Sequence, residues 1–417
     1  MRRMILTLAA ACVVLLTPVG SRVGAMPVCL AEPQTSDTTT SRLQPDPAGS
    51  RRLPAGLLST LRKDPYAYFR FINKAWARRV CAAFSADLPA LTRVRLHGDA
   101  HLEQYAFTDA AHGLDDFDDT SEGPSVIDSV RFLGSLDLAA RQRGWEADVD
   151  VLFDEFFRGY RTALRDPAYV PDTPMIVKRL RPRSTRGQKE FLEWAESLME
   201  PLSEQAVRET QESLARLAAL IGSVRPGLEP GYFTVKKIGQ LRLGIGSVLT
   251  LKQLIRVEGP SSAAEDDVVL EGKQLSDLAG VECLDVPKTG EIFRVIGGAE
   301  QIGRIRHEVL SVVPRRQADG PETRDWWIRN WDATYGEIDI DDLATREELK
   351  EVAHDVGAQL GSANLRERSP GLEAQMRQRE LETTERFEGR IRLLARQLAR
   401  ELLEEWARFR TRSDAER

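Results

Sequence analysis

Residues 97–128 read HGDAHLEQYAFTDAAHGLDDFDDTSEGPSVID and contain nine carboxylates, three of the five histidines and no Lys or Arg. The whole chain has 58 basic and 64 acidic residues, so this absence of positive charge is local. Acidic side chains at such a density repel one another, and a fold keeps them together mainly where a cation lies among them. We therefore expect the chemical centre of the protein in this stretch, with a divalent cation as its usual partner.

The composition of the chain is that of an ordinary soluble globular protein. With 417 residues, 42% of them hydrophobic and 29% charged, the chain is long enough for a large core and for two lobes or domains. Its formal net charge of −6 argues against a nucleic-acid partner, since general nucleic-acid binders carry an excess of Lys and Arg. Aromatic residues are scarce and are not interleaved with basic ones, so stacking platforms for single strands are not expected either.

Residues 1–31 are typical of a signal peptide. A short positive region is followed by an apolar run and by small residues that precede possible cleavage points after Ala25 or Ala31. Pro18 and Gly20 interrupt the apolar run, which is too short for a membrane span. We therefore expect export to the periplasm or the medium, with no transmembrane span after cleavage.

A start at Met26 would instead yield a cytoplasmic protein, and the sequence leaves both compartments open. Residues 32–51 are rich in Ser, Thr, Pro and Asp, so a disordered linker is expected there. Beyond it the chain holds only Cys81 and Cys283, which would pair after export or remain two buried thiols. There is no CxxC pair, so a thiolate zinc site is not expected.

The pattern of apolar residues predicts a mixture of helices and strands. Helical spacing occurs over 57–84, 125–165, 188–222 and 346–365, and over a long amphipathic segment at 380–410. Alternating β-branched residues predict a short strand before His97, several strands within 232–273 and another over 324–331, while 291–312 looks mixed. The Arg- and Lys-rich stretch 178–189 is expected to be a solvated loop. The class is therefore α+β.

The acidic stretch allows two chemical interpretations and one structural one. Asp99, in a loop after a strand, could accept or orient a hydroxyl proton, while Gln104 and Asp116 hold magnesium on the phosphates of a nucleotide. Alternatively, His97, Asp99 and His101 could ligate a transition metal for hydrolysis. In the structural interpretation, the carboxylates cap helices and the histidines bond to backbone groups.

A second feature favours the nucleotide. Gly244, Gly246 and Ser247 lie between two apolar, β-branched stretches, where glycines let the backbone approach phosphate oxygens. A bulged hairpin would explain the glycines equally well. A further strand, VVLEGKQL, follows with Lys273, and a glycine-rich hairpin followed by a strand lysine is how protein kinases hold the phosphates of ATP.

These segments carry a family resemblance. HGDAHLEQYAF, LDDFDD, GPSVIDSVRFLGSLDLAAR and the later GIGSV with VVLEGKQL resemble a bacterial family catalogued as domain of unknown function 2252, over roughly residues 52–366. That family is similar to the aminoglycoside phosphotransferase and protein-kinase group, whose catalytic loop reads HGDxxxxN and is followed by a metal-binding Asp.

The resemblance implies a role for each residue of the site. Asp99 is the catalytic base or hydroxyl-orienting group, and His97 braces its loop. The other roles are metal binding by Gln104, Asp116 and Asp118, phosphate binding by Gly244, Gly246 and Ser247, and contact of Lys273 with the α- and β-phosphates of ATP. Gln104 stands where the group has Asn, so its amide oxygen lies one methylene further out.

The resemblance also implies three supporting contacts. Either Glu300 or Glu308 is expected to pair with Lys273, and Asp128 is expected to hydrogen-bond the backbone of the catalytic loop. The segment RDWWIRNW, at 324–331, is expected to reach the hinge that receives adenine.

The order of these motifs is the reverse of that in kinases, where the glycine loop and the lysine come first. A circular permutation accounts for this order. It implies a two-lobed, kinase-like fold with a helical lobe at 52–225, a strand-rich nucleotide-binding lobe at 226–335 and C-terminal helices at 336–417 that complete the helical lobe.

The leading functional hypothesis is a phosphotransferase that depends on ATP or another nucleotide and on Mg²⁺, with an unknown acceptor. An exported enzyme would meet little ATP, so two rivals stay open. One is the metal-dependent hydrolase, and the other is an exported, non-catalytic binding protein that has kept a kinase-like fold.

Overall fold

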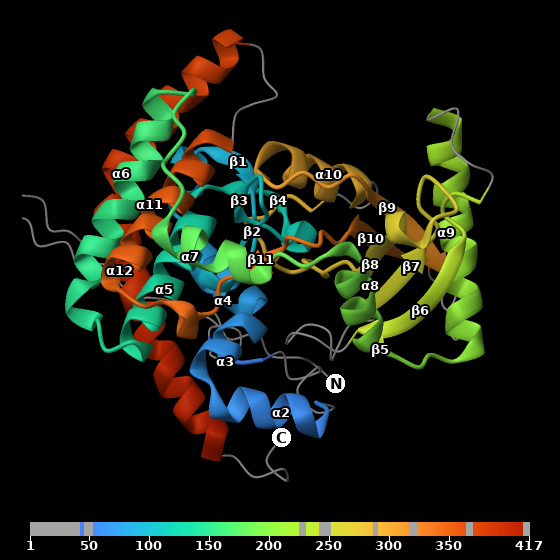
Figure 1. Ribbon diagram of the computed structural model, residues 1–417. Coiled ribbons are helices and arrows are strands. Elements are labelled where there is room, and N and C mark those ends of the chain that lie inside the picture. Colours follow the sequence, from blue (N-terminus) through green and yellow to red (C-terminus); the bar gives the residue numbers. More distant parts are fainter. Residues whose placement is uncertain are drawn as a thin grey trace, which may run out of the picture. The chain divides into compact units, whose positions relative to one another are not determined.

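The structure is a computed structural model, and it describes residues 42–45, 53–224, 231–241, 252–286, 291–316, 323–363 and 370–411. The predicted signal peptide and almost all of the predicted linker lie outside the described residues. The described residues belong to one compact unit, in which helices come first, a six-stranded sheet follows, and two long helices end the chain (Figure 1). This is the α+β class that the sequence predicts.

Three short helices replace the helical region predicted at 57–84. They are α2 (Ala55–Lys63), α3 (Pro65–Phe71) and α4 (Asn73–Ala83). The Asp64 side chain accepts hydrogen bonds from the backbone of Tyr66 and Ala67, and Pro65 is the first residue of α3, so a new helix begins there. The aromatic side chains of this region are buried in the main core.

Four long helices form the helical part of the unit. They are α5 (Val126–Gln142), α6 (Val149–Arg165), α11 (Arg346–Ala363) and α12 (Pro370–Thr411). α6 and α11 pack closely because glycines lie where they meet: a methyl group on Gly159 would lie 2.0 Å from the carbonyl oxygen of His354, and one on Gly357 would lie 2.1 Å from that of Phe156. α5 packs against α12 and α6, and all its residues from Val126 to Ala140 are buried.

Two small sheets frame the acidic stretch. β1 (Arg93–Leu96) pairs with β4 (Ser121–Pro124), and β2 (Tyr105–Phe107) lies between β3 (His112–Leu114) and β11 (Gly336–Glu337). All these pairings are antiparallel. Both ends of the acidic stretch are therefore attached to regular structure.

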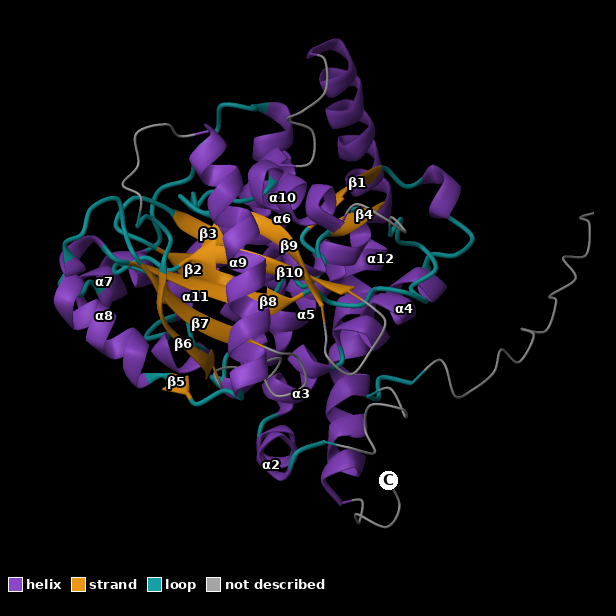
Figure 2. Cartoon of the chain, turned by 90° about the vertical axis from the view of Figure 1, so that its right-hand side faces the viewer, coloured by secondary structure: helices purple, strands orange, loops and turns teal. Residues whose placement is uncertain are grey.

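The middle of the chain forms an antiparallel sheet of six strands in the order β5-β6-β7-β8-β10-β9. The strands are β5 (Met199–Glu200), β6 (Val235–Leu241), β7 (Lys252–Val257), β8 (Val268–Gln274), β9 (Leu310–Arg316) and β10 (Thr323–Asn330). α9 (Glu204–Val224) crosses one face of this sheet, where Leu214 and Leu217 join Ile255 and Leu270 in a core cluster (Figure 2). α10 (Glu291–Gln301) connects β8 to β9 and contacts the turn η3 (Phe117–Asp119) of the acidic stretch.

Two predicted elements differ in the structure. The single helix predicted over 188–222 is divided into α8 (Gln188–Ser197) and α9 by β5, since Pro201 follows the strand and cannot continue a helix. The predicted loop at 178–189 is largely helical, as α7 (Met175–Ser184). Arg179 on α7 forms an ion pair with the buried Glu348, which holds this helix on α11.

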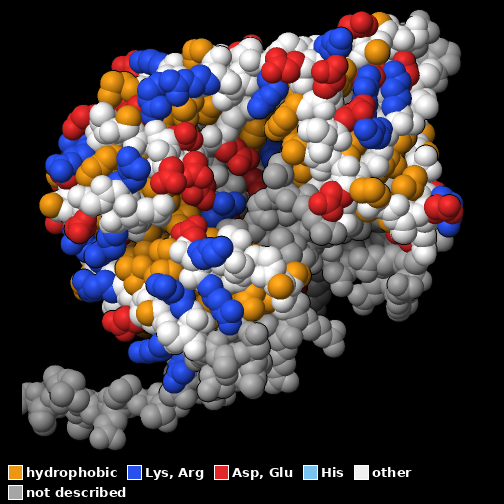
Figure 3. All heavy atoms as spheres, turned by 60° about the horizontal axis from the view of Figure 1, so that its bottom comes forward, with side chains coloured by type: hydrophobic (Ala, Val, Ile, Leu, Met, Phe, Trp, Pro, Cys, Tyr) orange, Lys and Arg blue, Asp and Glu red, His pale blue; other side chains and the backbone are white. Residues whose placement is uncertain are grey.

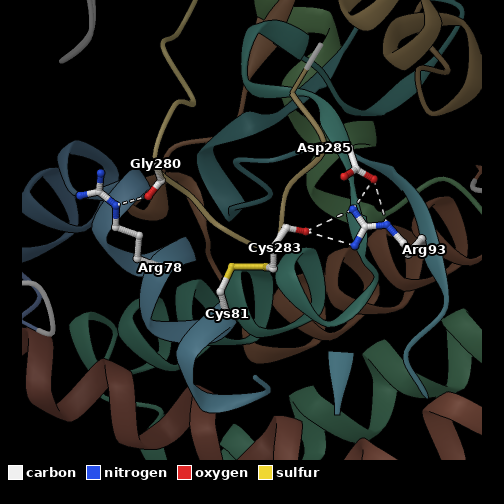
Figure 4. The surroundings of a disulfide bond; sticks show 6 residues. All are labelled: Arg78, Cys81, Arg93, Gly280, Cys283 and Asp285. Atoms are coloured by element: carbon white, nitrogen blue, oxygen red, sulfur yellow. Dashed lines mark hydrogen bonds and ion pairs between the residues drawn. A yellow bond between two sulfur atoms is a disulfide. The ribbon is translucent and has the colours of Figure 1, made fainter. Parts of the chain in front are cut away.

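A disulfide joins α4 to the segment that follows β8. Cys81 and Cys283 are bonded; their Cα atoms are 5.6 Å apart, and the two residues are 202 positions apart in the sequence (Figure 4). Of the two states that the sequence left open, the structure has the disulfide.

Hydrogen bonds hold the same segment in place. Arg78 Nε donates to the carbonyl oxygen of Gly280 at 2.7 Å, and Arg93 Nε donates to Asp285 at 3.0 Å (Figure 4). The backbone N–H of Asp285 donates to the carbonyl oxygen of Glu122 at 2.7 Å. The connection between β8 and α10 is therefore attached to the helical part at several points.

Two surface properties bear on partners. Among the described residues, no helix combines the length and the apolar character that crossing a membrane requires. On the face in Figure 3, the coloured Lys and Arg side chains are interspersed with acidic and hydrophobic ones and form no continuous basic surface.

We predict that Gly159→Ala destabilises the protein, because its methyl group would force the backbones of α6 and α11 apart. The expected cost is about 1–3 kcal/mol in the free energy of unfolding. Gly389→Ala is the matched control, since a methyl group on Gly389 in α12 meets nothing within 4 Å. The control is expected to stabilise α12 by about 0.5–1 kcal/mol. Urea unfolding followed by tryptophan fluorescence measures both, and equal effects would contradict the close packing of α6 and α11.

Candidate functional site

The loop after β1 is held by the side chain at the start of α5. Asp128 accepts hydrogen bonds from the backbone N–H groups of His97, at 2.7 Å, and Gly98, at 2.9 Å. A carboxylate in the first turn of a helix is favoured by the helix dipole, which helps to explain a buried acid there. The predicted role of Asp128 is confirmed.

Gly98 brings the same loop against the end of the acidic stretch. Its φ is +85°, and a methyl group there would lie 1.9 Å from the carbonyl oxygen of Asp119. Only glycine adopts this conformation and tolerates this contact without strain. The HGD sequence therefore places Asp99 beside η3.

His97 links the two halves of the acidic stretch. Its Nε2 lies 2.8 Å from the carbonyl oxygen of Asp115, and its Nδ1 lies 3.3 Å from the backbone N of Asp99. Nε2 therefore carries the hydrogen and Nδ1 accepts one. The ring also packs on Phe117, with the ring centres 5.1 Å apart. Each of these contacts makes His97 a brace for the loop, which is the role expected for it.

Asp99 is paired with an arginine that the sequence analysis missed. Both Nε and Nη2 of Arg131 donate to Asp99 Oδ1, at 3.0 and 2.8 Å, and the guanidinium lies 3.6 Å from the centre of the Phe69 ring. Burial by itself would raise the pKa of Asp99, but Arg131 and His101 hold it well below its usual value. Asp99 is therefore a carboxylate throughout the neutral pH range. The signal in the sequence was the spacing, since Arg131 follows Asp128 by one helical turn and shares its face.

Lys273 meets the aspartates of the DDFDD cluster. Its Nζ lies 2.9 and 2.7 Å from the two carboxylate oxygens of Asp116 and 3.0 Å from Oδ2 of Asp118. Asp116 has φ 68°, a left-handed conformation that is uncommon for a residue other than glycine. Residues 157 positions apart in the sequence therefore share one buried site.

The charges in this contact shift the pKa values of all three groups. Burial alone would raise the pKa of Asp116, but Lys273 and Arg329 hold it well below its usual value. Burial and the charge of Asp116 raise the pKa of Asp118 to about 8. Burial would lower the pKa of Lys273, yet the two aspartates raise it above its usual value. Lys273 therefore stays charged and is balanced mainly by Asp116.

The expected pairing of Lys273 with a glutamate of the following segment is wrong in this structure. Glu300 forms an exposed ion pair with Arg306 at 2.7 Å, and Glu308 is exposed. α10 contributes Arg294 instead, whose Nη1 donates to the carbonyl oxygen of Asp118 at 2.9 Å. The helix after the lysine strand thus supplies a positive group to the acidic stretch, where a negative one was expected.

A buried charge network continues from Lys273 across the sheet. Glu271, two residues earlier on β8, lies 2.8 Å from Lys252 Nζ and 3.2 Å from Arg329 Nε. Arg329 on β10 also pairs with Asp115. Lys252 and Arg329 lower the pKa of Glu271 to about 2, although burial opposes this shift. The segment RDWWIRNW therefore reaches the site through Arg329, and Trp331 donates to Glu271 at 2.8 Å just after β10.

Of the remaining residues of the predicted site, the structure describes Gln104 but not the predicted phosphate-binding residues. Gln104 ends a short turn after Asp99 and is buried. Its backbone carbonyl oxygen accepts a hydrogen bond from the backbone N–H of Asp115 at 2.9 Å. The predicted phosphate-binding residues Gly244, Gly246 and Ser247 lie outside the described residues. The segment that contains them connects β6 to β7, and β7 lies next to the lysine strand β8.

The geometry does not favour the metal-hydrolase interpretation. Both ring nitrogens of His97 are engaged with the backbone, and His101 packs against the rings of Tyr66 and Phe69. Burial lowers the pKa of His101 to about 4, and its Nε2 lies 3.5 Å from Asp99. Within the described part of the chain, no group of three His, Cys, Asp or Glu side chains is arranged to hold a metal ion.

We predict that Asp128→Ala loosens the HGD loop, because the buried N–H groups of His97 and Gly98 would lose their acceptor. Each unsatisfied group costs about 1–3 kcal/mol. Hydrogen exchange measured by mass spectrometry is expected to become faster in the peptide that contains residues 97–99. Asp137→Ala is the control, since Asp137 is buried on the same helix and pairs with Arg141 at 2.7 Å. An equal increase in both variants would contradict the assigned role.

The comparisons with known proteins give a family and no activity. No curated protein and no solved structure matches the chain. A family model described as an uncharacterized protein conserved in bacteria (DUF2252) matches residues 55–230 and 220–412. These ranges cover most of the chain and include every residue of the site described above. The chain therefore belongs to the DUF2252 family of bacterial proteins.

Proposed function

We propose that this protein is a kinase-like phosphotransferase that uses a nucleotide and magnesium. The observation that carries the proposal is the contact of Lys273 with Asp116 and Asp118. In protein kinases, a lysine on the third strand contacts the α- and β-phosphates, and an aspartate that binds magnesium lies beside it.

The connectivity of the sheet supports the same proposal. β6 and β7 are joined by the segment that holds the glycines, β8 follows with Lys273, and α10 comes next. This is the kinase order of glycine-rich loop, lysine strand and helix. Lys252 and Lys273 are register partners on β7 and β8, so two cations lie side by side next to the glycine segment.

A circular permutation is part of the proposal. The HGD loop follows β1, far before the sheet, whereas the chain leaving β10 forms β11 beside β2 and then α11 against α6. The segments that precede and follow the sheet in the sequence therefore form one helical part together. Such a rewiring requires only that the original ends could be joined and that the new ends lie at the surface.

The acidic stretch fits a magnesium ion. Mg²⁺ is usually held by one or two carboxylates together with phosphate oxygens, so a closed set of protein ligands is not required. Burial and the nearby charge of Asp116 raise the pKa of Asp118, and Lys273 offsets only part of this shift. Asp116 and Asp118, with Gln104 in support, would hold the ion, which would neutralise charge on the phosphates.

Asp99 would orient the acceptor hydroxyl. Its paired state with Arg131 makes it a weak base, because the lowered pKa disfavours proton uptake. Accepting a hydrogen bond from the hydroxyl requires only the carboxylate, which Arg131 and the loop hold in place. Arg131 is therefore a positioning residue in this proposal.

We predict that ATP with Mg²⁺ raises the unfolding free energy by about 2.7 kcal/mol at 100 times its dissociation constant. Thermal unfolding measures this shift, which is expected to disappear in Asp116→Ala and in Lys273→Met. Lys273→Met combined with Asp116→Asn removes the lysine together with the carboxylate that balances it, so it tests this pair with less risk of unfolding. Lys237→Ala is the control, because Lys237 lies on β6 of the same sheet and pairs with Glu196 at 2.6 Å.

Two outcomes would contradict the proposal. Unchanged unfolding with every nucleotide tested would favour the non-catalytic binding protein. Equal loss of the shift in Lys237→Ala and Lys273→Met would show that nucleotide binding does not depend on the lysine strand.

We also propose that the protein is exported. The Cys81–Cys283 disulfide supports this, because such bonds persist in oxidising compartments and are rare in the cytoplasm. N-terminal sequencing of protein isolated from its host is expected to find cleavage after Ala25 or Ala31. A thiol reagent should label Cys81 and Cys283 only after reduction. Labelling without reduction, together with a start at Met26, would overturn the proposal.

A further inference from the structure

A cavity of about 580 Å³ lies between α12 and the segment that leads into β1. Residues 89–93 form one wall, and residues of α12 between Leu372 and Phe387 form the other. β1 separates this cavity from the candidate site, because Arg93 begins the strand and His97 follows its end. Four residues of extended chain span roughly 13 Å. The cavity is therefore distinct from the site that contains Lys273.

Positive charge dominates the lining of the cavity. Three arginines and one glutamate line it, and Arg93 among them is already paired with Asp285. Arg379 and Arg386 have no carboxylate partner among the described residues, and both are exposed. They are seven residues apart on α12, so they lie on the same face about two turns from each other.

These two arginines differ from most others on α12. The helix contains many arginines, and several meet carboxylates: Arg377 with Glu373, Arg390 with Asp87, Arg392 with Glu388, Arg396 with Asp150 and Arg408 with Glu405. Neutralised arginines are thus common on this helix. Two guanidinium groups without such partners beside one cavity suit a carboxylate or phosphate, whose geometry the guanidinium fork matches.

The rest of the lining is partly apolar. Leu372 is 44% exposed beside the cavity, and Met376 and Phe387 line it as well. The Arg386 guanidinium lies 4.9 Å from the centre of the Phe387 ring, so charge and apolar surface are adjacent. Thr92 and Thr383 also line the cavity. Their hydroxyls are 3.0 Å apart, and both can reorient toward an acceptor.

The one acidic side chain of the lining forms no ion pair with either arginine. Glu382 accepts a hydrogen bond from Gln378 on its own helix at 2.9 Å, and it pairs with neither arginine. Glu380, on the same helix, is buried and accepts a hydrogen bond from Tyr160. Burial raises its pKa to about 7, so this carboxyl carries less negative charge than an ordinary glutamate.

We propose that this cavity binds a small amphipathic anion, with its carboxylate or phosphate group between Arg379 and Arg386 and its apolar body against Leu372, Met376 and Phe387. The volume suits a compact small molecule. A membrane lipid offers the same chemistry, and the experiment below separates the two sources. The inference does not depend on the proposed phosphotransferase activity.

The test uses the full-length protein and hexyl phosphate as the probe. In calorimetry, hexyl phosphate is expected to bind at least about tenfold more tightly than inorganic phosphate or hexanol, which each supply only half of the chemistry. Arg379→Gln with Arg386→Gln is expected to weaken binding by about tenfold or more, since both charged hydrogen-bond donors to the anion are removed. Arg400→Gln is the matched control, because Arg400 is exposed on the same helix and does not line the cavity.

A second variant tests the place of binding without removing charge. Ala90 lies exposed in the lining, so Ala90→Trp is expected to fill the cavity and abolish binding. Unchanged binding in Ala90→Trp, or equal loss in Arg400→Gln, would overturn the proposal. Binding to phosphatidate vesicles without binding of hexyl phosphate would overturn the small-molecule form of it. Nucleotide-dependent stabilisation is expected to be unchanged in all these variants, so failure of this inference is distinguishable from failure of the proposed function.

Discussion

The acidic stretch 97–128 contains no Lys or Arg, and the fold depends on bringing cationic side chains to three of its aspartates. Arg131 comes from α5, Lys273 from β8 and Arg329 from β10, and each pairs with a different aspartate. Breaking a buried pair by removing one partner costs about 3–5 kcal/mol, because the other charge is left without compensation. The three pairs therefore constrain where a helix and two strands, far apart in the sequence, can lie around the stretch.

The parts of this arrangement that the sequence predicts are those with a local signal. The HGD turn requires a glycine at Gly98, while the contacts of His97 and Asp128 with this loop are those that the family resemblance implied. The mixed class, the long terminal helix and the strands around Lys273 follow from periodicity. The expected proximity of Lys273 to Asp116 came from the resemblance, and the structure brings the two together.

What the sequence does not reveal is the choice of partner across long distances. Arg131 has a local signal, since it follows Asp128 by one helical turn. Arg294 and Arg329 are two among many arginines, and no spacing marks either of them as a residue that will be buried beside the acidic stretch. Glu300 was an equally reasonable partner for Lys273 by position, but it faces solvent and pairs locally. Some predicted helix boundaries were wrong for a related reason. A single turn or a two-residue strand such as β5 can interrupt a helix while the apolar residues keep their helical spacing in the sequence.

The cationic side chains balance only part of the negative charge of the acidic stretch, and this imbalance indicates what the stretch binds. Arg131, Lys273 and Arg329 balance three carboxylates, whereas burial and neighbouring negative charges raise the pKa of Asp118 to about 8 and that of Asp119 to about 6. A fold selected only for stability would replace such residues, since protonated or crowded carboxylates in a core contribute little. Retaining them is reasonable if a divalent cation takes the place of the protons in the working protein. The cation would then neutralise part of the charge of the aspartates that Lys273 pairs with. Lys273 could contact a phosphate instead, which is the role that its strand position suggests.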